Sequence, residues 1–436
     1  MSSRLFMRIL LVNPPNCGRS IPEERYGITS IKQIFRGEPL ALEALASNLS
    51  GHEVSLIDLK VEPGGLGDRL EKFVPDLVAF TAMTCEAQTV LKLARQVREW
   101  KNVPVVVGGV HASNDPQFFN REEIDWIVIG LGTQSFRELV DNLEAGLQSK
   151  VPGVARVRPG QAVRFQPRSY GPSDLTQKGS PRYDLVTSYR QEYRLESLGI
   201  QMGMVVTAAG CPFDCHFCCI APVTGGRYLH VSPQAVVRDL VCLEDIPVVR
   251  LVDANCFGNS QQAFDLAEAI AAVGIRKQYI ADVRADTVVN CPELLKRWKE
   301  VGLRAVVIGF EGINDKDLSG MNKMLLESTN REAIALLHKL GITIIGDFII
   351  SPEYDEDQFD RLSGYVRECQ IELPMYTVMT PLPGTRLYSK LAEQIVVTDL
   401  DYYTLTNAVL PTCLPEELFY QRYAALLQEG HQHARI

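Results

Sequence analysis

The sequence predicts an α/β protein in which a doubly wound N-terminal domain is followed by a partial (β/α)6 barrel and a small C-terminal helical cap. Two series of short apolar runs, rich in Val and Ile, alternate with stretches of helical periodicity, which is typical of strand–helix units around a parallel sheet. A Pro-rich stretch separates the two series. The expected boundaries are 1–145 for the first domain, 146–195 for a linker, 196–392 for the barrel and 393–436 for the cap.

The first series contains five strand–helix units. Between the strands, apolar residues three and four positions apart predict helices, for example at 86–100. A doubly wound sheet binds its ligand beyond the carboxyl ends of the strands, so the loops that follow them are expected to carry function. The expected strands are Arg8–Val12, Val54–Asp58, Leu77–Thr81, Pro104–Val107 and Trp126–Ile129.

The second series contains six units and follows a linker with five prolines and little apolar periodicity. Six units suit a barrel or partial barrel, in which functional residues again lie at the ends of strands. The last 40 or so residues lack the alternation and end in an expected helix at 415–432, which predicts a cap. The expected barrel strands are Gly203–Thr207, Val248–Asp253, Tyr279–Val283, Ala305–Ile308, Thr343–Ile349 and Met375–Met379.

Length, composition and charge agree with this organisation. The 436 residues suffice for two or three domains of about 150 residues each. Hydrophobic residues at 46% and charged residues at 22% argue against a disordered, collagen-like or coiled-coil chain. The net charge of −9 disfavours nucleic acid as a partner. Since no apolar run approaches the roughly 20 residues that span a bilayer, and the N-terminal run is too short for a secretion signal, we expect a cytoplasmic protein without a transmembrane segment.

The eleven cysteines fall into two groups. An odd number of cysteines in a chain without an export signal argues against a disulfide framework. Seven stand alone and are expected to pack as small hydrophobes: Cys17, Cys85, Cys242, Cys256, Cys291, Cys369 and Cys413. The other four lie within nine residues: Cys211, Cys215, Cys218 and Cys219.

Three of the clustered cysteines are spaced as ligands. Cys211, Cys215 and Cys218 follow the first barrel strand with three and then two residues between them. Three thiolates on such a loop can hold three irons of a 4Fe–4S cluster and leave the fourth iron open. The alternative is a zinc site, but no second pair of Cys or His with suitable spacing occurs. Cys219 could compete as a ligand, although the spacing favours Cys218.

This spacing, with Phe217 before the last cysteine, resembles the radical S-adenosylmethionine superfamily. The resemblance implies that the open iron binds S-adenosylmethionine and that an electron from the cluster cleaves it to a 5′-deoxyadenosyl radical. Other segments between 200 and 390 resemble strand ends of the same family, with Ala254 at a position where that family often has a second Asp. These segments are Leu251-Val-Asp-Ala-Asn, Asp282-Val-Arg-Ala-Asp, Ile308-Gly-Phe-Glu-Gly, Met321-Asn-Lys and Thr380-Pro-Leu-Pro-Gly.

Polar side chains at the ends of the barrel strands point toward the space above the cluster. Asp253, Arg284 and Glu311 are therefore the expected hydrogen-bonding partners of S-adenosylmethionine, together with Phe217 as a cofactor-binding residue. The alternative for each polar residue is a pair with another barrel side chain. Lys323 is expected to be a solvated charge, as lysines in loops usually are.

Small residues at three neighbouring strand ends of the first domain predict a groove for a large flat ligand, because backbone can approach such a ligand closely there. Together with Leu10-Leu-Val-Asn-Pro-Pro and Glu38-Pro-Leu-Ala-Leu-Glu, they make residues 7–145 resemble the flavodoxin-like cobalamin-binding domain that precedes many radical S-adenosylmethionine domains. The expected cobalamin-binding residues are Thr81, Met83, Gly108, Gly109, His111, Gly130 and Gly132.

The first domain also departs from its relatives. The Asp-x-His-x-x-Gly motif that supplies an axial histidine is absent, so we expect cobalt without histidine ligation and His111 as a loop contact. The loop Gly130-Leu-Gly-Thr replaces the frequent Gly-Glu-Gly-Glu and removes a carboxylate. A nucleotide-binding domain is the competing interpretation, but Asn13-Pro-Pro-Asn stands where a Gly-x-Gly-x-x-Gly turn would be needed.

The two resemblances together imply a cobalamin-dependent radical S-adenosylmethionine C-methyltransferase. One S-adenosylmethionine would methylate cobalamin, and a second would yield the radical that activates an unactivated carbon. Arg36-Gly-Glu-Pro-Leu and Asp401-Tyr-Tyr are similar to segments of enzymes that methylate hopanoids and related isoprenoid or tetrapyrrole skeletons. A reductant protein such as flavodoxin or ferredoxin is implied. Two alternatives stay open: ring closure, oxidation or ring rearrangement without methyl transfer, and a non-enzymatic cobalamin sensor.

Overall fold

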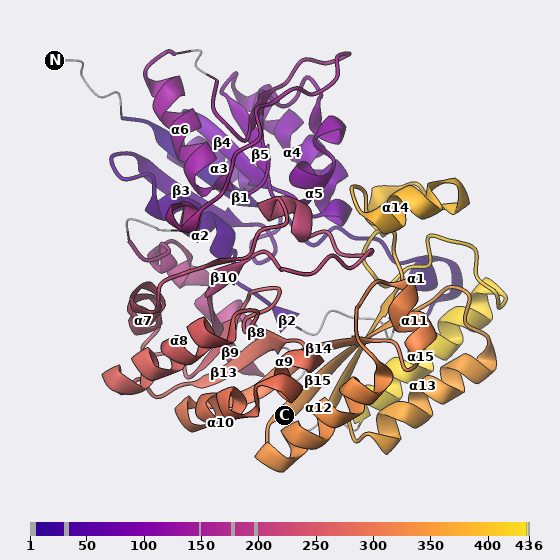
Figure 1. Ribbon diagram of the computed structural model, residues 1–436. Helices are drawn as coiled ribbons and strands as arrows, with labels where there is room; N and C mark the ends of the chain where they lie inside the picture. Colours follow the sequence, from indigo (N-terminus) through magenta and orange to yellow (C-terminus); the bar gives the residue numbers. More distant parts are fainter. Residues whose placement is uncertain are drawn as a thin grey trace. The chain divides into compact units, whose positions relative to one another are not determined.

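The computed structural model describes residues 6–29, 35–147, 150–175, 179–195, 199–432 and 434 (Figure 1). Contacts between residues divide the chain into two compact units, each of which is described by itself below. The first unit comprises Met1–Gly18, Glu38–Glu192 and Cys219–Leu229. The second unit comprises Arg19–Gly37, Tyr193–Cys218 and His230–Ile436.

The first unit is built on a six-stranded sheet in the order β3-β1-β4-β5-β6-β7. Five strands are parallel and coincide with the five expected from the sequence, whereas β7 pairs antiparallel with β6. Because β1 lies between β3 and β4, the strand order reverses there, which is where doubly wound sheets bind ligands. The flavodoxin-like prediction is confirmed. The strands are β1 (Arg8–Asn13), β3 (Glu53–Asp58), β4 (Leu77–Thr81), β5 (Val105–Gly108), β6 (Trp126–Val128) and β7 (Val154–Arg156).

Amphipathic helices cover this sheet. In α4 the buried residues Ala87, Val90, Ala94 and Val97 recur at spacings of three and four and form one apolar face. The central strand β1 is buried along almost its whole length, which requires the continuous apolar run of the sequence. The helices are α2 (Leu40–Ser47), α3 (Leu66–Phe73), α4 (Ala87–Trp100), α5 (Val110–Asn114) and α6 (Gly132–Glu144).

The expected linker contributes more structure than its composition indicates. It contains β7, which extends the first sheet at the β6 edge. It also contains a 3-10 segment at Tyr183–Glu192, in which Tyr183, Val186 and Tyr189 are buried. A strand of three residues flanked by prolines leaves too little alternation to be recognised in the sequence.

The second unit is built on an eight-stranded sheet in the order β16-β15-β14-β13-β12-β9-β8-β2. Six neighbouring strands are parallel and form a half-barrel, which confirms the predicted partial (β/α)6 barrel. The short strands β8 (Arg194–Leu195) and β2 (Phe35–Arg36) extend the β9 edge antiparallel. The parallel strands are β9 (Ile200–Val205), β12 (Val248–Leu251), β13 (Gln278–Val283), β14 (Leu303–Glu311), β15 (Thr343–Ile350) and β16 (Leu373–Val378).

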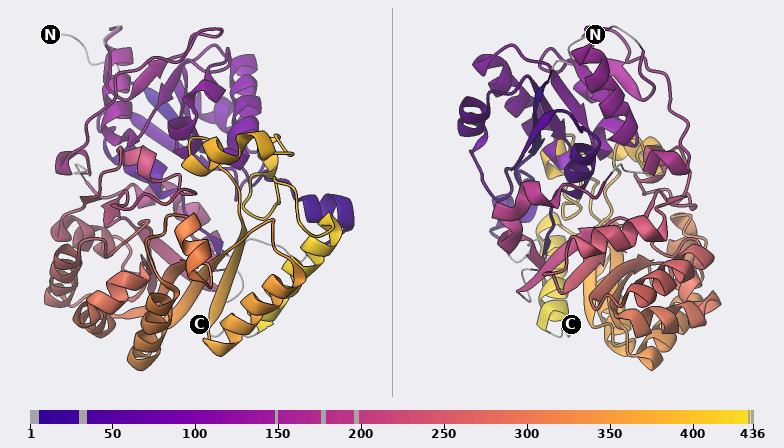
Figure 2. Two further views of the ribbon diagram at one scale, coloured as in Figure 1. Left: turned by 45° about the vertical axis from the view of Figure 1, so that its right-hand side comes forward. Right: turned by 90° about the vertical axis from the view of Figure 1, so that its left-hand side faces the viewer.

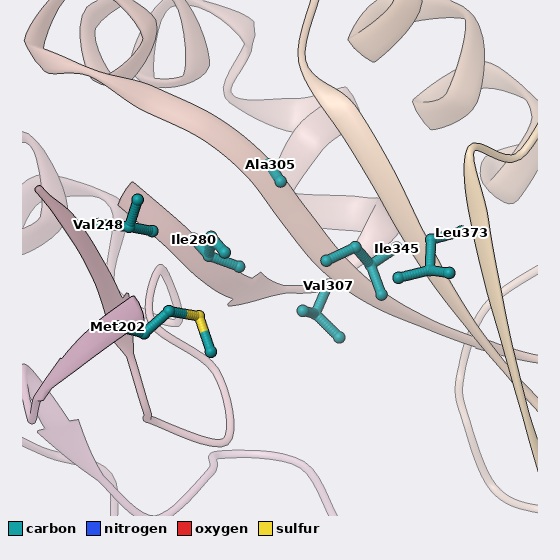
Figure 3. Close-up of a cluster of buried hydrophobic side chains, with 7 residues drawn as sticks. All are labelled: Met202, Val248, Ile280, Ala305, Val307, Ile345 and Leu373. Atoms are coloured by element: carbon teal, nitrogen blue, oxygen red, sulfur yellow. The ribbon is translucent and has the colours of Figure 1, made fainter. Parts of the chain in front are cut away.

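The two faces of the half-barrel are distinguished by their aromatic contacts. Tyr279 packs edge-on against Trp298 of a covering helix, and Phe348 packs against Tyr365 of another. Alternate residues of these strands therefore face the opposite, concave side. Seven of the concave-side residues, contributed by all six parallel strands, form an apolar cluster (Figure 3): Met202, Val248, Ile280, Ala305, Val307, Ile345 and Leu373. The main helices of this layer are α7 (Pro233–Val241), α8 (Ser260–Val273), α9 (Ala285–Asn290), α10 (Pro292–Val301), α11 (Asp315–Gly320), α12 (Glu327–Leu340) and α13 (Glu356–Glu368).

The C-terminal segment packs onto the last barrel strand. Helix α15 (Glu416–Gln432) runs beside α13 (Figure 2), and the Tyr423 hydroxyl donates a 2.8 Å hydrogen bond to the Tyr376 carbonyl of β16. The short helix α14 (Arg386–Leu391) precedes it. Among the described residues, no helix has the length and hydrophobicity required to cross a membrane.

The contact-based units differ from the expected domain ranges near the N-terminus. Helix α1 (Ile21–Tyr26) falls within the range expected for the first domain but packs in the second unit. The backbone amide of Ile21 donates to the Asn407 side chain at 2.8 Å, and Arg25 forms a 2.7 Å ion pair with Glu416. These partners lie almost 400 positions away, so no local sequence pattern reveals them.

All eleven cysteines fall within the described residues, and none forms a disulfide, as expected. The packing interpretation of the single cysteines holds for Cys256 and Cys369, which are buried. It is wrong for Cys242 and Cys413, which are exposed: Cys242 stands at the end of α7, and Cys413 lies outside the helices and strands.

Candidate active site

The three cysteines with ligand spacing stand on the loop that follows β9 and the short strand β10 (Ala208–Ala209). Cys211, Cys215 and Cys218 are each partly accessible. The loop begins at Gly210, whose φ of +81° is readily adopted only by glycine. The backbone amide of Cys218 donates to the Cys215 carbonyl at 3.1 Å, which closes a turn between the two thiols. Three thiols on one short loop therefore suit the ligation of a 4Fe–4S cluster.

Asp253 anchors the backbone that leads into this loop. It lies just beyond the end of β12 and accepts a 2.9 Å hydrogen bond from the Thr207 amide and another from the Thr207 hydroxyl. Burial raises the pKa of this carboxyl to about 6, although its hydrogen bonds to the loop oppose that rise. The Asp253 carboxyl is thus paired with Thr207 within the barrel. Such a pair is the alternative that the sequence left open to direct contact with S-adenosylmethionine.

Arg284 connects the cysteine loop to the segment that follows β14. Its guanidinium carbon lies 3.5 Å from the ring centroid of Phe213, which stands between the first two cysteines of the loop. The same guanidinium donates to the Lys323 carbonyl at 3.0 Å and forms a 3.1 Å ion pair with Asp286. Its position depends on α9, which begins directly after it.

Glu311 and Lys323 form a buried ion pair with 2.7 Å between Lys323 Nζ and Glu311 Oε1. The β14–β15 register shifts between Gly309 and Glu311, and Glu311 adopts a φ of +63°. A Cβ added at Gly309 would lie 2.2 Å from Glu311 Oε1, so any other residue there would displace the Glu311 carboxylate from its ion pair. The expectation that Lys323 is solvated is wrong, because a carboxylate buried at the strand end requires a cationic partner.

Two cationic side chains lie near Cys215. Burial raises the pKa of its thiol, while the nearby Lys323 and Arg284 act to lower it. Positive charges beside a thiol favour the thiolate, which is the form that binds iron. The structure thus brings the predicted residues Arg284 and Glu311 to the cysteine loop, and it adds Lys323, which the sequence interpretation had placed in solvent. Phe217, half-buried, lies on the loop itself.

Further backbone contacts fix the loop. The amide of His216 donates to the Met321 carbonyl at 3.0 Å, and the Asn322 side chain donates to the Asp214 carbonyl at 2.8 Å. The amide of Leu387 donates to the His216 carbonyl at 2.9 Å. Sequence reasoning missed these partners, since the separations exceed 100 residues and the atoms on the loop side belong to the backbone.

In the first unit, the predicted glycines gather at the carboxyl ends of neighbouring strands. Thr81 pairs in register with Gly108, and Gly130 follows the adjacent strand β6. Gly109 has a φ of +98°, and a Cβ there would lie 2.7 Å from the Ala82 amide nitrogen. Glycine is thus required for the close approach of the β4 and β5 loops. Two other predicted residues are less constrained: a Cβ at Gly132 would make an ordinary 3.4 Å contact, and the Met83 side chain is 53% exposed.

His111 is fully buried beside this edge. Its ring meets Phe118 and Phe119 edge-on at centroid distances of 5.2 and 5.6 Å. Neither ring nitrogen has a hydrogen-bond partner among the residues that the structure describes. Burial lowers the pKa of the imidazole to about 4, so the ring is neutral near pH 7. The histidine supports the loop through packing and presents no exposed atom to a ligand.

Tyr170, from the expected linker, closes the Gly130 loop. Its hydroxyl accepts a 2.9 Å hydrogen bond from the Leu131 amide, and a Cβ at Gly130 would lie 1.9 Å from that oxygen. Gly130 also has a φ of +85°, which excludes most other residues. The sequence offers no signal for this contact, because a lone tyrosine in a Pro-rich stretch looks like any surface residue.

Comparisons with known proteins agree with this geometry. Two protein-family profiles match the chain: the B12 binding domain at residues 32–140 and the Radical SAM superfamily at residues 205–364. Hopanoid C-3 methylase from Methylococcus capsulatus is 30% identical over 400 residues, which cover 89% of this chain and 75% of that protein. The chain belongs to the cobalamin-dependent radical S-adenosylmethionine methyltransferase family. An uncharacterized methyltransferase from Pyrococcus horikoshii is 31% identical over 407 residues, covering 90% of this chain and 85% of that protein.

A solved structure shares the fold. The radical S-adenosylmethionine methyltransferase TsrM from Kitasatospora setae, which has cobalamin and a [4Fe-4S] cluster bound, matches with a TM-score of 0.73. The sequences are 18% identical, and the match covers 98% of this chain and 89% of that one. Family membership confirms that the chain is an enzyme and that its cofactors are cobalamin, a 4Fe–4S cluster and S-adenosylmethionine.

Proposed function

We propose that the protein transfers a methyl group to an unactivated carbon atom of a small-molecule substrate. The observation that carries this proposal is the presence, in one chain, of a three-cysteine loop on a half-barrel and a doubly wound domain of the B12-binding type. The two relatives reported above, each at least 30% identical to this chain, are named as a methylase and a methyltransferase, which supports methyl transfer.

The barrel residues hold the cluster and its ligand. When bound, cobalamin supplies a methyl group, and the cluster with S-adenosylmethionine supplies the radical that removes a hydrogen atom from the substrate. Cys211, Cys215 and Cys218 bind three irons through their thiolates. The cationic groups of Arg284 and Lys323 act on Cys215 in favour of its thiolate and would offset negative charge of the cluster.

We assign S-adenosylmethionine to the strand ends above the loop. Glu311 has two carboxylate oxygens, of which Oε1 receives Lys323 Nζ, so Oε2 remains available to accept from an ammonium or ribose group. Arg284 contacts Phe213 of the same loop, and Phe217 lies on that loop. Asp253 contributes through the backbone that it anchors rather than by contact.

We assign cobalamin to the glycine-rich edge of the first unit. Backbone at these strand ends can approach the ring closely because side chains are small or absent. The fully buried His111 supports the expectation that cobalt has no histidine ligand from this loop. The assigned residues are Thr81, Met83, Gly108, Gly109, Gly130 and Gly132, with His111 packing behind them.

We assign the substrate to molecules with isoprenoid or tetrapyrrole skeletons. The name of the hopanoid relative supports the isoprenoid class. A reductant protein such as flavodoxin or ferredoxin delivers the electron that the cluster requires. The half-barrel loop, with its three partly accessible thiols, is the expected point of entry for that electron.

The test uses reconstituted enzyme, S-adenosylmethionine with a deuterated methyl group, and mass spectrometry of the product. A product heavier by 3 Da supports methyl transfer, and 5′-deoxyadenosine formation without this label contradicts it. Replacing Cys211, Cys215 and Cys218 with Ala should abolish S-adenosylmethionine cleavage while cobalamin binding persists. The matched control replaces the exposed Cys242 with Ala and should leave cleavage intact. Absence of iron–sulfur absorption and of cleavage in the wild type would instead favour a sensor.

A further inference from the structure

A layer of charged side chains lies on the concave face of the half-barrel, next to the apolar cluster of Figure 3. Each stands two positions after a member of that cluster, and two positions along a strand return to the same face. The concave face therefore changes from apolar to charged toward the carboxyl ends of the strands. The three charged residues are Arg250, Asp282 and Asp347, which follow Val248, Ile280 and Ile345.

Two residues of this layer, Arg250 and Asp282, form an ion pair with each other. Arg250 Nη2 lies 3.1 Å from both carboxylate oxygens of Asp282, and Arg250 Nε lies 3.4 Å from Asp282 Oδ2. Burial raises the pKa of Asp282, while Arg250 opposes that rise. Both side chains are half-buried, and their paired hydrogen bonds fix them as one polar group on the concave face.

Asp347 is different, because its carboxyl makes no hydrogen bond or ion pair with any residue that the structure describes. It is half-buried on the concave face and stands directly beside Gly309 of β14 in the strand register. A Cβ at Gly309 would lie 2.2 Å from Glu311 Oε1 and 2.9 Å from Lys323 Nζ, so the Glu311–Lys323 pair occupies the space beside Gly309 and lies next to Asp347. The carboxyl stays partly accessible on the concave face, and a ligand that covers it there must supply a hydrogen bond, because a polar group covered without a partner costs stability.

The charges that face Asp347 determine what that ligand can be. Glu311 of β14 and Asp282 of β13 oppose its ionisation, while Arg250 of β12 and Lys323 favour it. Burial dominates and raises the pKa of Asp347 to about 8, so the carboxyl is mostly neutral at pH 7. A neutral carboxyl both donates and accepts a hydrogen bond. A substrate carboxylate would be repelled by Asp282 and Glu311.

We propose that Asp347 donates a hydrogen bond to an uncharged acceptor of the substrate, such as a carbonyl, amide or hydroxyl oxygen, beside the Arg250–Asp282 pair. This inference rests on the proposed function and narrows its substrate class: the end of the substrate that enters the half-barrel is polar. A skeleton of carbon and hydrogen alone does not fit, because it would cover the Asp347 carboxyl without satisfying it.

The experiment uses holoenzyme with cluster and cobalamin, and as probes a water–methanol extract and a hexane extract of cells of the source organism. The readout is the consumption of S-adenosylmethionine that each extract stimulates. We expect stimulation by the water–methanol extract and a loss of about tenfold in Asp347→Leu. Asp347→Asn, whose amide also donates and accepts, should retain most of the stimulation. The matched control Asp357→Asn, on the exposed side of α13, should behave as wild type.

A pH profile separates binding from a structural role. Stimulation of the wild type should decline as pH rises through about 8, where Asp347 ionises, and Asp347→Asn should lack this decline. Cobalamin and iron–sulfur absorption of each variant report folding, and the Asn variant preserves the test if the Leu variant does not fold. Stimulation by the hexane extract alone, or wild-type stimulation of the folded Leu variant, would overturn the inference.

Two outcomes distinguish a wrong role for Asp347 from a wrong assignment of methyl transfer. Stimulated consumption that depends on Asp347 but gives no +3 Da product would contradict methyl transfer and still support the polar substrate. A +3 Da product that contains only carbon and hydrogen would support methyl transfer and overturn the role of Asp347.

Discussion

The side-chain amide of Asn114 donates a 3.0 Å hydrogen bond to the backbone carbonyl of Cys219. Asn114 is the last residue of α5, the helix that carries His111 beside the glycine-rich edge. Cys219 is bonded directly to Cys218 of the cluster loop, and Cys219–Leu229 packs within the first unit. The chain thus passes from the proposed cluster ligands straight into a segment that is held by the cobalamin-binding domain.

Replacing Asn114 with Ala should loosen this attachment. One neutral hydrogen bond is worth about 1 kcal/mol, so the fold should survive. Because the segment beside Cys218 would be less fixed, we expect less methylated product for each 5′-deoxyadenosine formed, by a few-fold. Quantifying both products by mass spectrometry checks this. Asn142→Ala on α6 is the matched control. An unchanged product ratio in the Asn114 variant would show that the hydrogen bond has no bearing on coupling.

Replacing Lys323 with Met should destabilise the barrel strongly. The buried carboxylate of Glu311 would lose its 2.7 Å partner, and breaking a buried pair from one side costs roughly 3–5 kcal/mol. Thermal unfolding should show a clear fall in Tm, and the double variant Lys323→Met/Glu311→Gln should recover part of it. Lys316→Met on the exposed surface of α11 should change little. Equal Tm values for Lys323→Met and Lys316→Met would contradict a buried ion pair between Lys323 and Glu311.

Replacing Gly130 with Ala should distort the glycine-rich edge. The new methyl group would meet the Tyr170 hydroxyl, and the positive φ alone costs about 1–3 kcal/mol. We expect weaker cobalamin binding, measured by titration with hydroxocobalamin, and partial recovery when Tyr170→Phe is added. Gly132→Ala, whose methyl group makes only an ordinary contact, is the control for folding stability. If both Ala variants unfold at the same temperature, the strain at Gly130 is absent.

Asp253 should make stability depend on pH. Its pKa in the folded protein is about 6, above the value of about 3.9 for an unfolded chain. The folded state therefore binds the proton more tightly, and this contribution is present below pH 4 and lost as pH rises through 6. A shift of this size corresponds to about 3 kcal/mol. Chemical unfolding at several pH values should show that Asp253→Asn gains stability relative to the wild type between pH 4 and 7. A constant difference across this interval would contradict the shift.

The sequence predicts those features that have a local pattern. The parallel strands of both sheets are recognisable because strands buried on both faces require continuous runs of Val, Ile and Leu; the predicted Leu77–Thr81 coincides with β4. The cluster cysteines are recognisable because their ligand spacing lies within eight residues. Arg284 and Glu311 could be selected as candidates because polar side chains at the ends of barrel strands point toward one side of the barrel.

Contacts between residues that are far apart in the sequence leave no local pattern from which they could be predicted. The contact of Tyr170 with the Gly130 loop spans about 40 residues, and that of Asn114 with Cys219 spans 105. The burial of Lys323 follows from the register shift that turns Glu311 inward, which a sequence does not display. Asp347 looked like one polar residue in an apolar strand, and only the fold shows that it faces Glu311 and Asp282 on the concave side.

Methyl transfer by this enzyme is tested by the stoichiometry of the reaction with S-adenosylmethionine bearing a deuterated methyl group. We expect each product molecule to gain 3 Da and to be accompanied by one 5′-deoxyadenosine and one S-adenosylhomocysteine, since one S-adenosylmethionine is cleaved at the cluster and another donates its methyl group. Formation of 5′-deoxyadenosine with an unlabelled product and no S-adenosylhomocysteine would show that the enzyme does not transfer a methyl group.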